Sequence, residues 1–321
     1  MGEAAPLVAT PAAPVPPGGA AEWFTGAGGY RLRAALFPAV GEARGSVVLS
    51  GGRTEPIEKY FEVIEELRHR GFTVLAHDWR GQGLSQRLLP DRLRGHARNA
   101  DDFLADYQAL IAAFEDRLPK PWIAMGHSMG GCLTTLALAR GEDRFAACAL
   151  SAAMLGLHLS GIPHPVAVLL ARTLTLAGAG GGYVQQRQDS PTSVKFEDNI
   201  LTHDAHRYAR NQAQIIACPD LILGGPTWGW LNFALSACHE LRHGPGTTKI
   251  NIPLFLVAAG DDRLVDVAQQ REVIGRIPGA RFVEAPGAFH EILQETDETR
   301  AIFWREFDAL VARLEPDAAL V

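Results

Sequence analysis

The stretch "PWIAMGHSMGGCL" (residues 121–133) places Ser128 between two glycines, one two residues before it and one two residues after it. Glycine is abundant in this chain, at 33 of 321 residues, so the spacing alone is a weak signal. The flanking runs are apolar, however, and predict a buried strand ending near Gly126 and a helix beginning near Met129. Ser128 would then lie in a sharp turn where any larger side chain at 126 or 130 collides. This context favours a nucleophilic serine.

Short apolar segments alternate with amphipathic segments on both sides of this turn. Such alternation predicts a mainly parallel central sheet flanked by helices, an α/β fold. Residues 22–39 precede it and predict a β-hairpin turning at residues 27–29. Strands are predicted within residues 45–52, 72–81, 122–128, 145–152, 251–262 and 280–285, and helices within residues 58–71, 101–118, 129–140, 267–277 and 299–314.

The alternation stops between Ala153 and Asn251, although neighbouring parallel strands need only a short crossover. This stretch has helical patterns of its own, around residues 166–177, 204–217 and 228–243. We therefore expect a helical lid inserted after the strand that follows the nucleophile helix, at the sheet edge where ligands bind. The predicted divisions are a disordered tail at 1–20, a core at 21–153 and 250–321, and a lid at 154–249.

Composition narrows the class of protein. The hydrophobic fraction of 47% and charged fraction of 21% are typical of a globular protein with a sizeable core. The net charge of −6 gives no general attraction to nucleic acid, so no nucleic-acid partner is expected. The four cysteines are scattered and indicate reduced core residues. No secretory signal or membrane span is recognised, which predicts a cytoplasmic protein; the sequence leaves the oligomeric state open.

A nucleophilic serine needs a histidine base and an acid that orients it. His290 follows the last predicted strand in a glycine-containing loop, and it is the only histidine after His243. The preceding strand ends in Asp261 and Asp262, and one of the two should face His290. The resulting chain order of serine, acid and histidine is one of the known orders for such sites.

Two backbone N–H groups are needed to stabilise an oxyanion. Met129 follows the nucleophile and lies at a helix start, so its N–H is the first candidate. The loop "LSGGRTE" (residues 49–55) follows the first core strand, and its glycines allow a close approach to substrate. Arg53 is the predicted second donor, through its backbone N–H.

Four motifs together resemble a known family: "GHSMGG" (126–131), "DWRGQGLS" (78–85), "GDDRLVD" (260–266) and "FHEILQE" (289–295). The resemblance spans roughly residues 30–315. It is to the α/β-hydrolase group that contains monoacylglycerol lipases and bacterial lysophospholipases, also described as serine aminopeptidase-like hydrolases.

This resemblance implies an α/β-hydrolase fold, the nucleophile Ser128, the acid Asp262 and the base His290. It also implies cleavage of carboxylic esters through an acyl-enzyme, with no cofactor or metal. Many members carry His-Gly in the oxyanion loop, whereas this chain has Gly51-Gly52 followed by Arg53.

The predicted lid bears on the substrate. It holds seven Lys or Arg and six Asp or Glu, so it is close to neutral, and it is rich in leucine and aromatic residues. Trp228, Trp230 and Phe233 are expected either to line an acyl-chain channel or only to pack the lid onto the core. A small acyl ester or lysolipid is the expected substrate. The lid is also expected to contact a membrane surface transiently, at the inner face of the membrane.

Three alternatives stay open from the sequence. The same fold supports exopeptidase or amidase chemistry. The stretch "HELRH" (239–243) matches a zinc-peptidase pattern with Glu240 as general base, although Gly244-Pro245 ends the helix and Lys249 occupies the next ligand position. A binding module without catalysis is the third alternative, against which Ser128, Asp262 and His290 all count.

Overall fold

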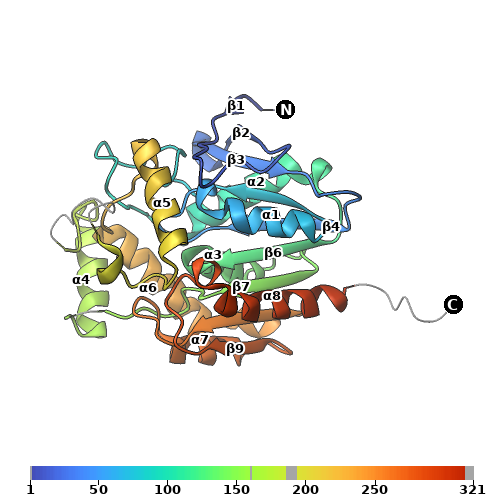
Figure 1. Cartoon of the computed structure of the whole chain (residues 1–321). Helices are drawn as coiled ribbons and strands as arrows, with labels where there is room; N and C mark the ends of the chain where they lie inside the picture. The colour runs from blue at the N-terminus through green and yellow to red at the C-terminus, as the bar shows by residue number, and fades with distance from the viewer. Residues whose placement is uncertain (1, 160, 186–193, 315–321) are drawn as a thin grey trace.

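One sheet of nine strands organises the computed structural model, which describes residues 2–159, 161–185 and 194–314 (Figure 1). The strand order across the sheet is β1-β2-β3-β5-β4-β6-β7-β8-β9. The pairs from β1 to β5 are antiparallel, and all pairs from β5 to β9 are parallel. The strands are β1 (Ala4–Ala5), β2 (Ala20–Thr25), β3 (Arg31–Phe37), β4 (Gly45–Ser50), β5 (Phe72–His77), β6 (Trp122–His127), β7 (Ala147–Ser151), β8 (Leu254–Ala259) and β9 (Arg281–Ala285).

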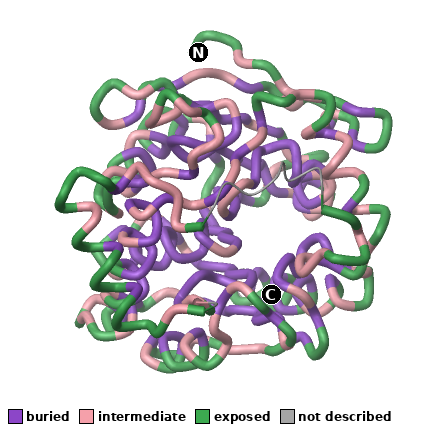
Figure 2. The backbone as a smooth tube through the Cα atoms, turned by 90° about the vertical axis from the view of Figure 1, so that its left-hand side faces the viewer, coloured by how far each residue is buried: buried purple, intermediate pink, exposed green. Residues whose placement is uncertain are grey.

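Helices cover both faces of this sheet, as the alternating pattern predicted. Val48 of β4 packs with α2, α3 and α7 on one face, whereas its neighbours Val47 and Leu49 pack with α1 and α8 on the other. The two-residue period of a strand explains this division. Buried residues fill the centre of the molecule (Figure 2). These helices are α1 (Phe61–His69), α2 (Ala100–Phe114), α3 (Ser128–Ala139), α7 (Val267–Ile274) and α8 (Asp297–Ala312).

The segment between β7 and β8 has three further helices: α4 (His164–Leu176), α5 (Ala205–Ala217) and α6 (Trp228–His243). We call residues 154–249 the inserted segment. Its helix α6 begins where the Thr227 side chain accepts a hydrogen bond from the Trp230 N–H. Apolar residues of α6 join the core beside α3, so this helix is fixed firmly on the sheet domain.

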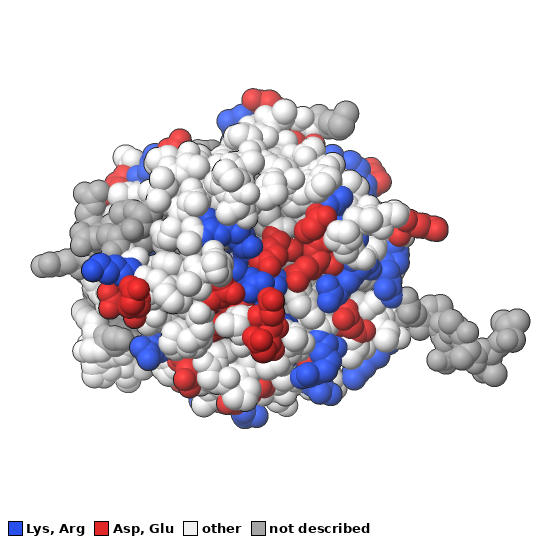
Figure 3. Space-filling model, viewed as in Figure 1, with Lys and Arg blue, Asp and Glu red and all other residues white. Residues whose placement is uncertain are grey.

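Charged side chains fix α5 to the core as well. Glu62 of α1 accepts hydrogen bonds from Arg207 of α5 at 2.7 and 2.9 Å, and pairs with Arg210 at 2.7 Å. Arg300 of α8 joins the same carboxylate at 3.2 Å. Acidic and basic side chains accordingly gather near the middle of the face seen in Figure 3. We call Glu62, Arg207, Arg210 and Arg300 the clasp.

The prediction of a disordered tail over residues 1–20 is wrong for residues 2–20. Ala4 and Ala5 pair with β2, and the carbonyl of Pro6 accepts a hydrogen bond from Nη1 of Arg33 at 2.9 Å. The Val8 N–H donates to Glu58 at 3.1 Å. Arg33 is fully buried and pairs with Glu58 and Asp78. Because buried charged groups need partners, this ion network holds a segment whose composition alone resembles a free tail.

Candidate active site

The turn at Ser128 has the geometry that its glycines predicted. Strand β6 ends at His127 and α3 begins at Ser128, whose φ of 50° lies in the left-handed region. A Cβ atom on Gly130 would lie 2.2 Å from the Ser50 carbonyl oxygen, and one on Gly126 would lie 2.7 Å from Cα of Gly131. Neither position accepts a side chain. The strain of order 1–3 kcal/mol at a serine with positive φ is typical of functional turns.

Three of the predicted site residues meet at this turn. Nε2 of His290 lies 2.9 Å from Oγ of Ser128, and Nδ1 of His290 lies 2.7 Å from Oδ2 of Asp262. The other oxygen of Asp262 accepts hydrogen bonds from the backbone N–H groups of Leu264 at 2.8 Å and Val265 at 3.0 Å. These bonds fix the carboxylate, which in turn fixes the imidazole plane.

Electrostatics favour proton transfer along this line. Burial alone would lower the pKa of His290, but the Asp262 carboxylate outweighs it and raises the pKa above the ordinary value. Burial would likewise raise the pKa of Asp262, but the charge of His290 and the bonds to its carboxylate lower it. Asp262 thus stays ionised and stabilises a protonated His290. Burial lowers the pKa of the neighbouring His127 to about 4, and its Nδ1 lies 3.0 Å from the Ser151 carbonyl oxygen, away from this line.

In the loop after β4, the backbone N–H groups on either side of Arg53 already have acceptors. The Gly52 N–H donates to Oε2 of Glu55 at 2.5 Å, and the Thr54 N–H donates to Gln82 at 2.7 Å. Between them, the Arg53 N–H has no acceptor among the residues that the structure describes. A Cβ atom on Gly52 would lie 3.0 Å from Cβ of Ser128, so this loop passes close to the serine.

A buried polar cluster behind the loop had no signal in the sequence. Lys59 pairs with Glu55 at 2.7 Å and with Glu291 at 2.5 Å, and the Tyr60 hydroxyl donates to Glu55 at 2.5 Å. Burial would raise the pKa of Glu55, but Lys59 lowers it to about 2. Glu55 therefore remains an acceptor for Gly52 and holds the loop in place. Lys59 and Glu291 lie 232 residues apart in the chain, which no local pattern reveals.

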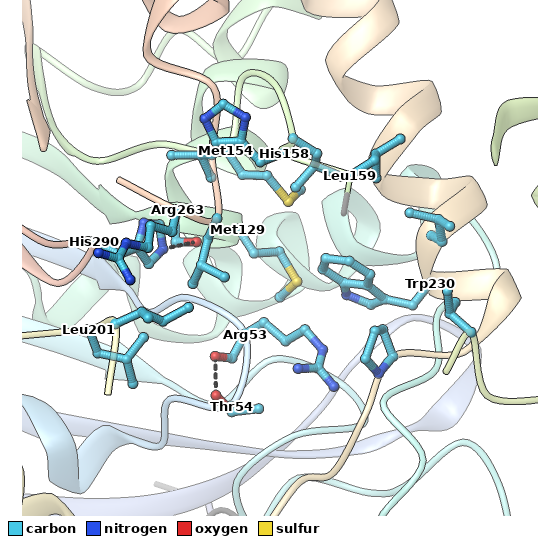
Figure 4. Close-up of a pocket in the computed structure, with 18 of the residues that line it drawn as sticks. Arg53, Thr54, Met129, Met154, His158, Leu159, Leu201, Trp230, Arg263 and His290 are labelled. Atoms are coloured by element: carbon cyan, nitrogen blue, oxygen red, sulfur yellow. Dashed lines mark hydrogen bonds between the residues drawn. The ribbon is translucent and has the colours of Figure 1, made fainter. Parts of the chain in front are cut away.

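A cavity of about 450 Å³ opens at Ser128 and His290 (Figure 4). Among the described residues, its lining includes Trp230 but neither Trp228 nor Phe233. Phe233 is buried behind Trp230, with ring centroids 6.3 Å apart, and Trp228 packs against apolar residues of α4 and α6. The inserted segment supplies most of the apolar lining: Met154, Leu157, Leu159, Ile162, Ala167, Val184, Ile200, Leu201, Trp230 and Leu231.

The zinc-peptidase pattern lies on α6. The rings of His239 and His243 are 4.6 Å apart, as expected for neighbours one helical turn apart. Glu240 is held in a two-point salt bridge by Arg140. Within the described residues, no group of three or more His, Cys, Asp or Glu side chains is arranged to hold a metal ion.

Comparisons with known proteins identify the family and the fold. Residues 41–297 match the family described as serine aminopeptidase, S33. Lysophospholipase L2 of Escherichia coli K12 is 33% identical over 295 residues, covering 87% of this chain and 83% of that protein. A monoacylglycerol lipase of Mycolicibacterium smegmatis is 26% identical over 279 residues, covering 86% and 91% of the two chains.

A solved structure supports the fold. A soluble variant of the monoglyceride lipase of Saccharomyces cerevisiae, in complex with a substrate analog, superposes with a TM-score of 0.71 at 18% identity, over 91% of this chain and 94% of that one. The chain belongs to the serine aminopeptidase S33 family of hydrolases and has the α/β-hydrolase fold.

Proposed function

We propose that this protein is a serine hydrolase that cleaves the ester of single-chain lipids, a lysophospholipid or a monoacylglycerol, through an acyl-enzyme on Ser128. The observation that carries the proposal is the hydrogen-bonded line from Ser128 through His290 to Asp262 at the end of an apolar cavity. Its volume of about 450 Å³ lies within the usual range for small-ligand sites. The names of the two relatives, a lysophospholipase and a monoacylglycerol lipase, support the same substrate class.

In the first half of the reaction, Oγ of Ser128 attacks the ester carbonyl carbon while its proton moves to Nε2 of His290. The carbonyl oxygen becomes an oxyanion, which the backbone N–H groups of Met129 and Arg53 stabilise. Asp262 stabilises the imidazolium that forms. The intermediate then collapses: the alcohol leaves with the proton from His290, and the acyl group stays on Ser128.

In the second half, water attacks the acyl-enzyme and gives a proton to His290. The same two N–H groups stabilise the second oxyanion. Collapse of this intermediate returns the proton to Oγ of Ser128 and releases the fatty acid. No metal ion or organic cofactor takes part in either half.

The cavity wall favours an ester over a peptide substrate. An exopeptidase on this fold needs a free carboxylate to bind the substrate's amino group. Glu55 and Glu291 line the cavity, but both are ion-paired to Lys59, so neither is a free carboxylate. Amidase chemistry on the same serine is therefore only the second candidate. The acyl chain of a lipid ester matches the apolar wall better than a peptide does.

The outer side of α4 favours contact with a membrane surface. Leu169 is 65% exposed and Leu176 is 79% exposed, while Ala167 of the same helix faces the cavity. None of the helices in the described residues is both long enough and apolar enough to cross a bilayer. We propose that the inserted segment acts as a lid and rests transiently on a lipid surface, placing the protein at the cytoplasmic face of a membrane.

A fluorophosphonate probe tests the nucleophile. The label is expected on Ser128, and Ser128→Ala should abolish both labelling and ester hydrolysis. Ser151→Ala is the matched control, because Ser151 ends the adjacent strand but contacts His127 rather than His290. Labelling of another serine, or full activity in Ser128→Ala, would refute the mechanism.

A substrate panel tests the class. Monoolein, lysophosphatidylcholine, p-nitrophenyl butyrate and a prolyl naphthylamide separate lipid esters, small esters and amides. We expect hydrolysis of the lipid esters and the small ester; preference for the amide would favour the second candidate.

A further inference from the structure

A second cavity, of about 730 Å³, lies beside the first. Residues from both the core and the inserted segment line both cavities, and because some of these residues are shared, the two cavities adjoin. Helix α5 contributes three carboxamide side chains to the second cavity, and the Oδ1 atom of Asn211 has no hydrogen-bond partner among the described residues. The shared lining residues are Arg53, Thr54, Ile200, Leu201, Leu264 and Glu291.

Arg53 stands at this junction as a partly buried cation, and none of the described residues gives it a carboxylate partner. Its side chain extends along the cavity wall toward Trp230, with the guanidinium carbon 5.4 Å from the ring centroid (Figure 4). Nη2 donates to the carbonyl of Gly224, while Nε is buried and finds no acceptor among the described residues. In the part of the chain that the structure describes, no ion pair joins Arg53 to an acidic residue.

The other cations around the two cavities differ from Arg53. Lys59 is neutralised by Glu55 and Glu291. Arg263 is exposed at the edge of the first cavity and lies over the Phe289 ring. Burial lowers the pKa of Arg53 to about 10, which still leaves it charged at neutral pH. A buried, unpaired charge destabilises a protein, and an anionic ligand would compensate for it.

We infer that the Arg53 guanidinium binds the phosphate of a lysophospholipid, with the acyl chain in the first cavity and the head group in the second. The inference rests on the proposed function and specifies its substrate. The backbone N–H of Arg53 faces the ester in that proposal, and only the glycerol backbone separates ester from phosphate in such a lipid. The planar guanidinium fork suits a phosphate's oxygens. A monoacylglycerol carries no charge there.

The test compares two substrates with the same acyl chain, oleoyl lysophosphatidylcholine and monoolein. The readout is the ratio of their kcat/KM values, with kcat and KM measured separately. Arg53→Met should lower this ratio about 10- to 100-fold, mainly through a higher KM for the phospholipid, because a charge-assisted contact is lost. Arg53→Lys should give an intermediate ratio, since it keeps the charge but loses the fork.

Arg87→Met is the matched control. Arg87 is also a partly buried cation whose pKa burial lowers to about 10, and it donates to the carbonyls of Asp220 and Ile222 in the loop that Arg53 also holds. It does not line either cavity among the described residues. Its substitution should leave the ratio within about twofold of the wild type. A similar fall in both Met variants would show that Arg53 only braces the loop, and would overturn the inference.

Product inhibition gives a second readout. Glycerophosphocholine should inhibit hydrolysis of p-nitrophenyl butyrate by the wild type, and much more weakly in Arg53→Met, whereas glycerol should inhibit neither. The phosphate site alone is refuted if the wild type cleaves both oleoyl lipids but Arg53→Met leaves the ratio of their kcat/KM values unchanged. It is also refuted if Arg263→Met, rather than Arg53→Met, lowers that ratio. A wild-type enzyme that cleaves neither lipid refutes the proposed function itself.

Discussion

Asp262 contacts His290 through one carboxylate oxygen, at 2.7 Å, while its neighbour Asp261 is exposed to solvent. Only one of two successive residues at the end of β8 can point toward the imidazole. We expect Asp262→Asn to lower kcat by on the order of 10⁴, because the amide no longer fixes the tautomer of His290. Asp261→Asn should stay within about tenfold of wild type, or about 1.4 kcal/mol.

Ester hydrolysis by both variants, with circular dichroism to verify folding, checks this assignment. If the folded Asp261→Asn protein is the inactive one, the acid has been assigned to the wrong residue, although the serine mechanism survives.

The pH profile of kcat/KM should reflect the raised pKa of His290. Only the neutral imidazole can accept the proton of Ser128, so activity falls as the pH drops through this pKa. Because Asp262 raises the pKa above 6.5, the acidic limb of the profile should lie above pH 6.5 with p-nitrophenyl butyrate. Asp262→Asn should move that limb to lower pH. A wild-type limb below pH 6 would contradict the electrostatic account.

The tryptophans of the inserted segment should differ in their effect on acyl-chain preference. Trp230 lines the cavity and Trp228 packs against α4. Trp230→Ala should therefore change the activity ratio between long and short p-nitrophenyl esters several-fold more than it changes butyrate turnover, while Trp228→Ala leaves the ratio close to wild type. Equal shifts in both variants would mean that packing of the inserted segment, rather than contact with the acyl chain, sets the preference.

Removal of metal ions should not affect activity. The carboxylate of Glu240 in the "HELRH" stretch already forms a salt bridge with Arg140. Among the described residues, no third metal ligand lies beside His239 and His243. Dialysis against a strong chelator should leave hydrolysis of p-nitrophenyl butyrate intact, and His239→Ala should behave like wild type. Loss of activity that zinc restores would revive the metallopeptidase alternative.

The clasp should stabilise the fold in a defined pH range. Burial would raise the pKa of Glu62, but the hydrogen bond from Arg207 and the charges around it lower it to about 2. A folded-state pKa below the ordinary 4.5 means that the stabilisation is complete above pH 4.5 and is lost as the pH falls toward 2.

Glu62→Gln should thus reduce the free energy of unfolding at pH 7 by about 1–3 kcal/mol. Glu65→Gln removes a carboxylate of the same helix that lies outside the clasp and, among the described residues, pairs only with nearby residues of that helix, so it should cost less than about 1 kcal/mol. Urea titrations at pH 7 and pH 3 measure both; an unchanged difference between wild type and Glu62→Gln at the two pH values would count against the clasp.

The sequence predicted what depends on local pattern. The glycines around Ser128 could be interpreted because a tight turn excludes side chains at known positions. The hairpin turning at residues 27–29 and the positions of the parallel strands along the chain followed from periodicity. The family resemblance chose Asp262 over Asp261, which spacing alone did not.

What the sequence could not predict depends on contacts between distant residues. Charged residues are usually exposed, and nothing in the local sequence marks these three as different. They are nevertheless buried together: Glu55, Lys59 and Glu291. One aromatic stretch contains Trp228, Trp230 and Phe233. Their positions around the axis of α6 decide which of them lines the cavity, and of these three only Trp230 does.

The N-terminal segment has a consequence for handling the protein. β1 is only two residues long, yet it covers part of the outer edge of β2, and the Pro6 carbonyl lies on the buried Arg33. A chain shortened to begin at Ala20 would present the six-residue β2 as an open edge strand, a template for pairing with other chains. We therefore expect residues 2–8 to protect against aggregation, so an affinity tag is better attached elsewhere.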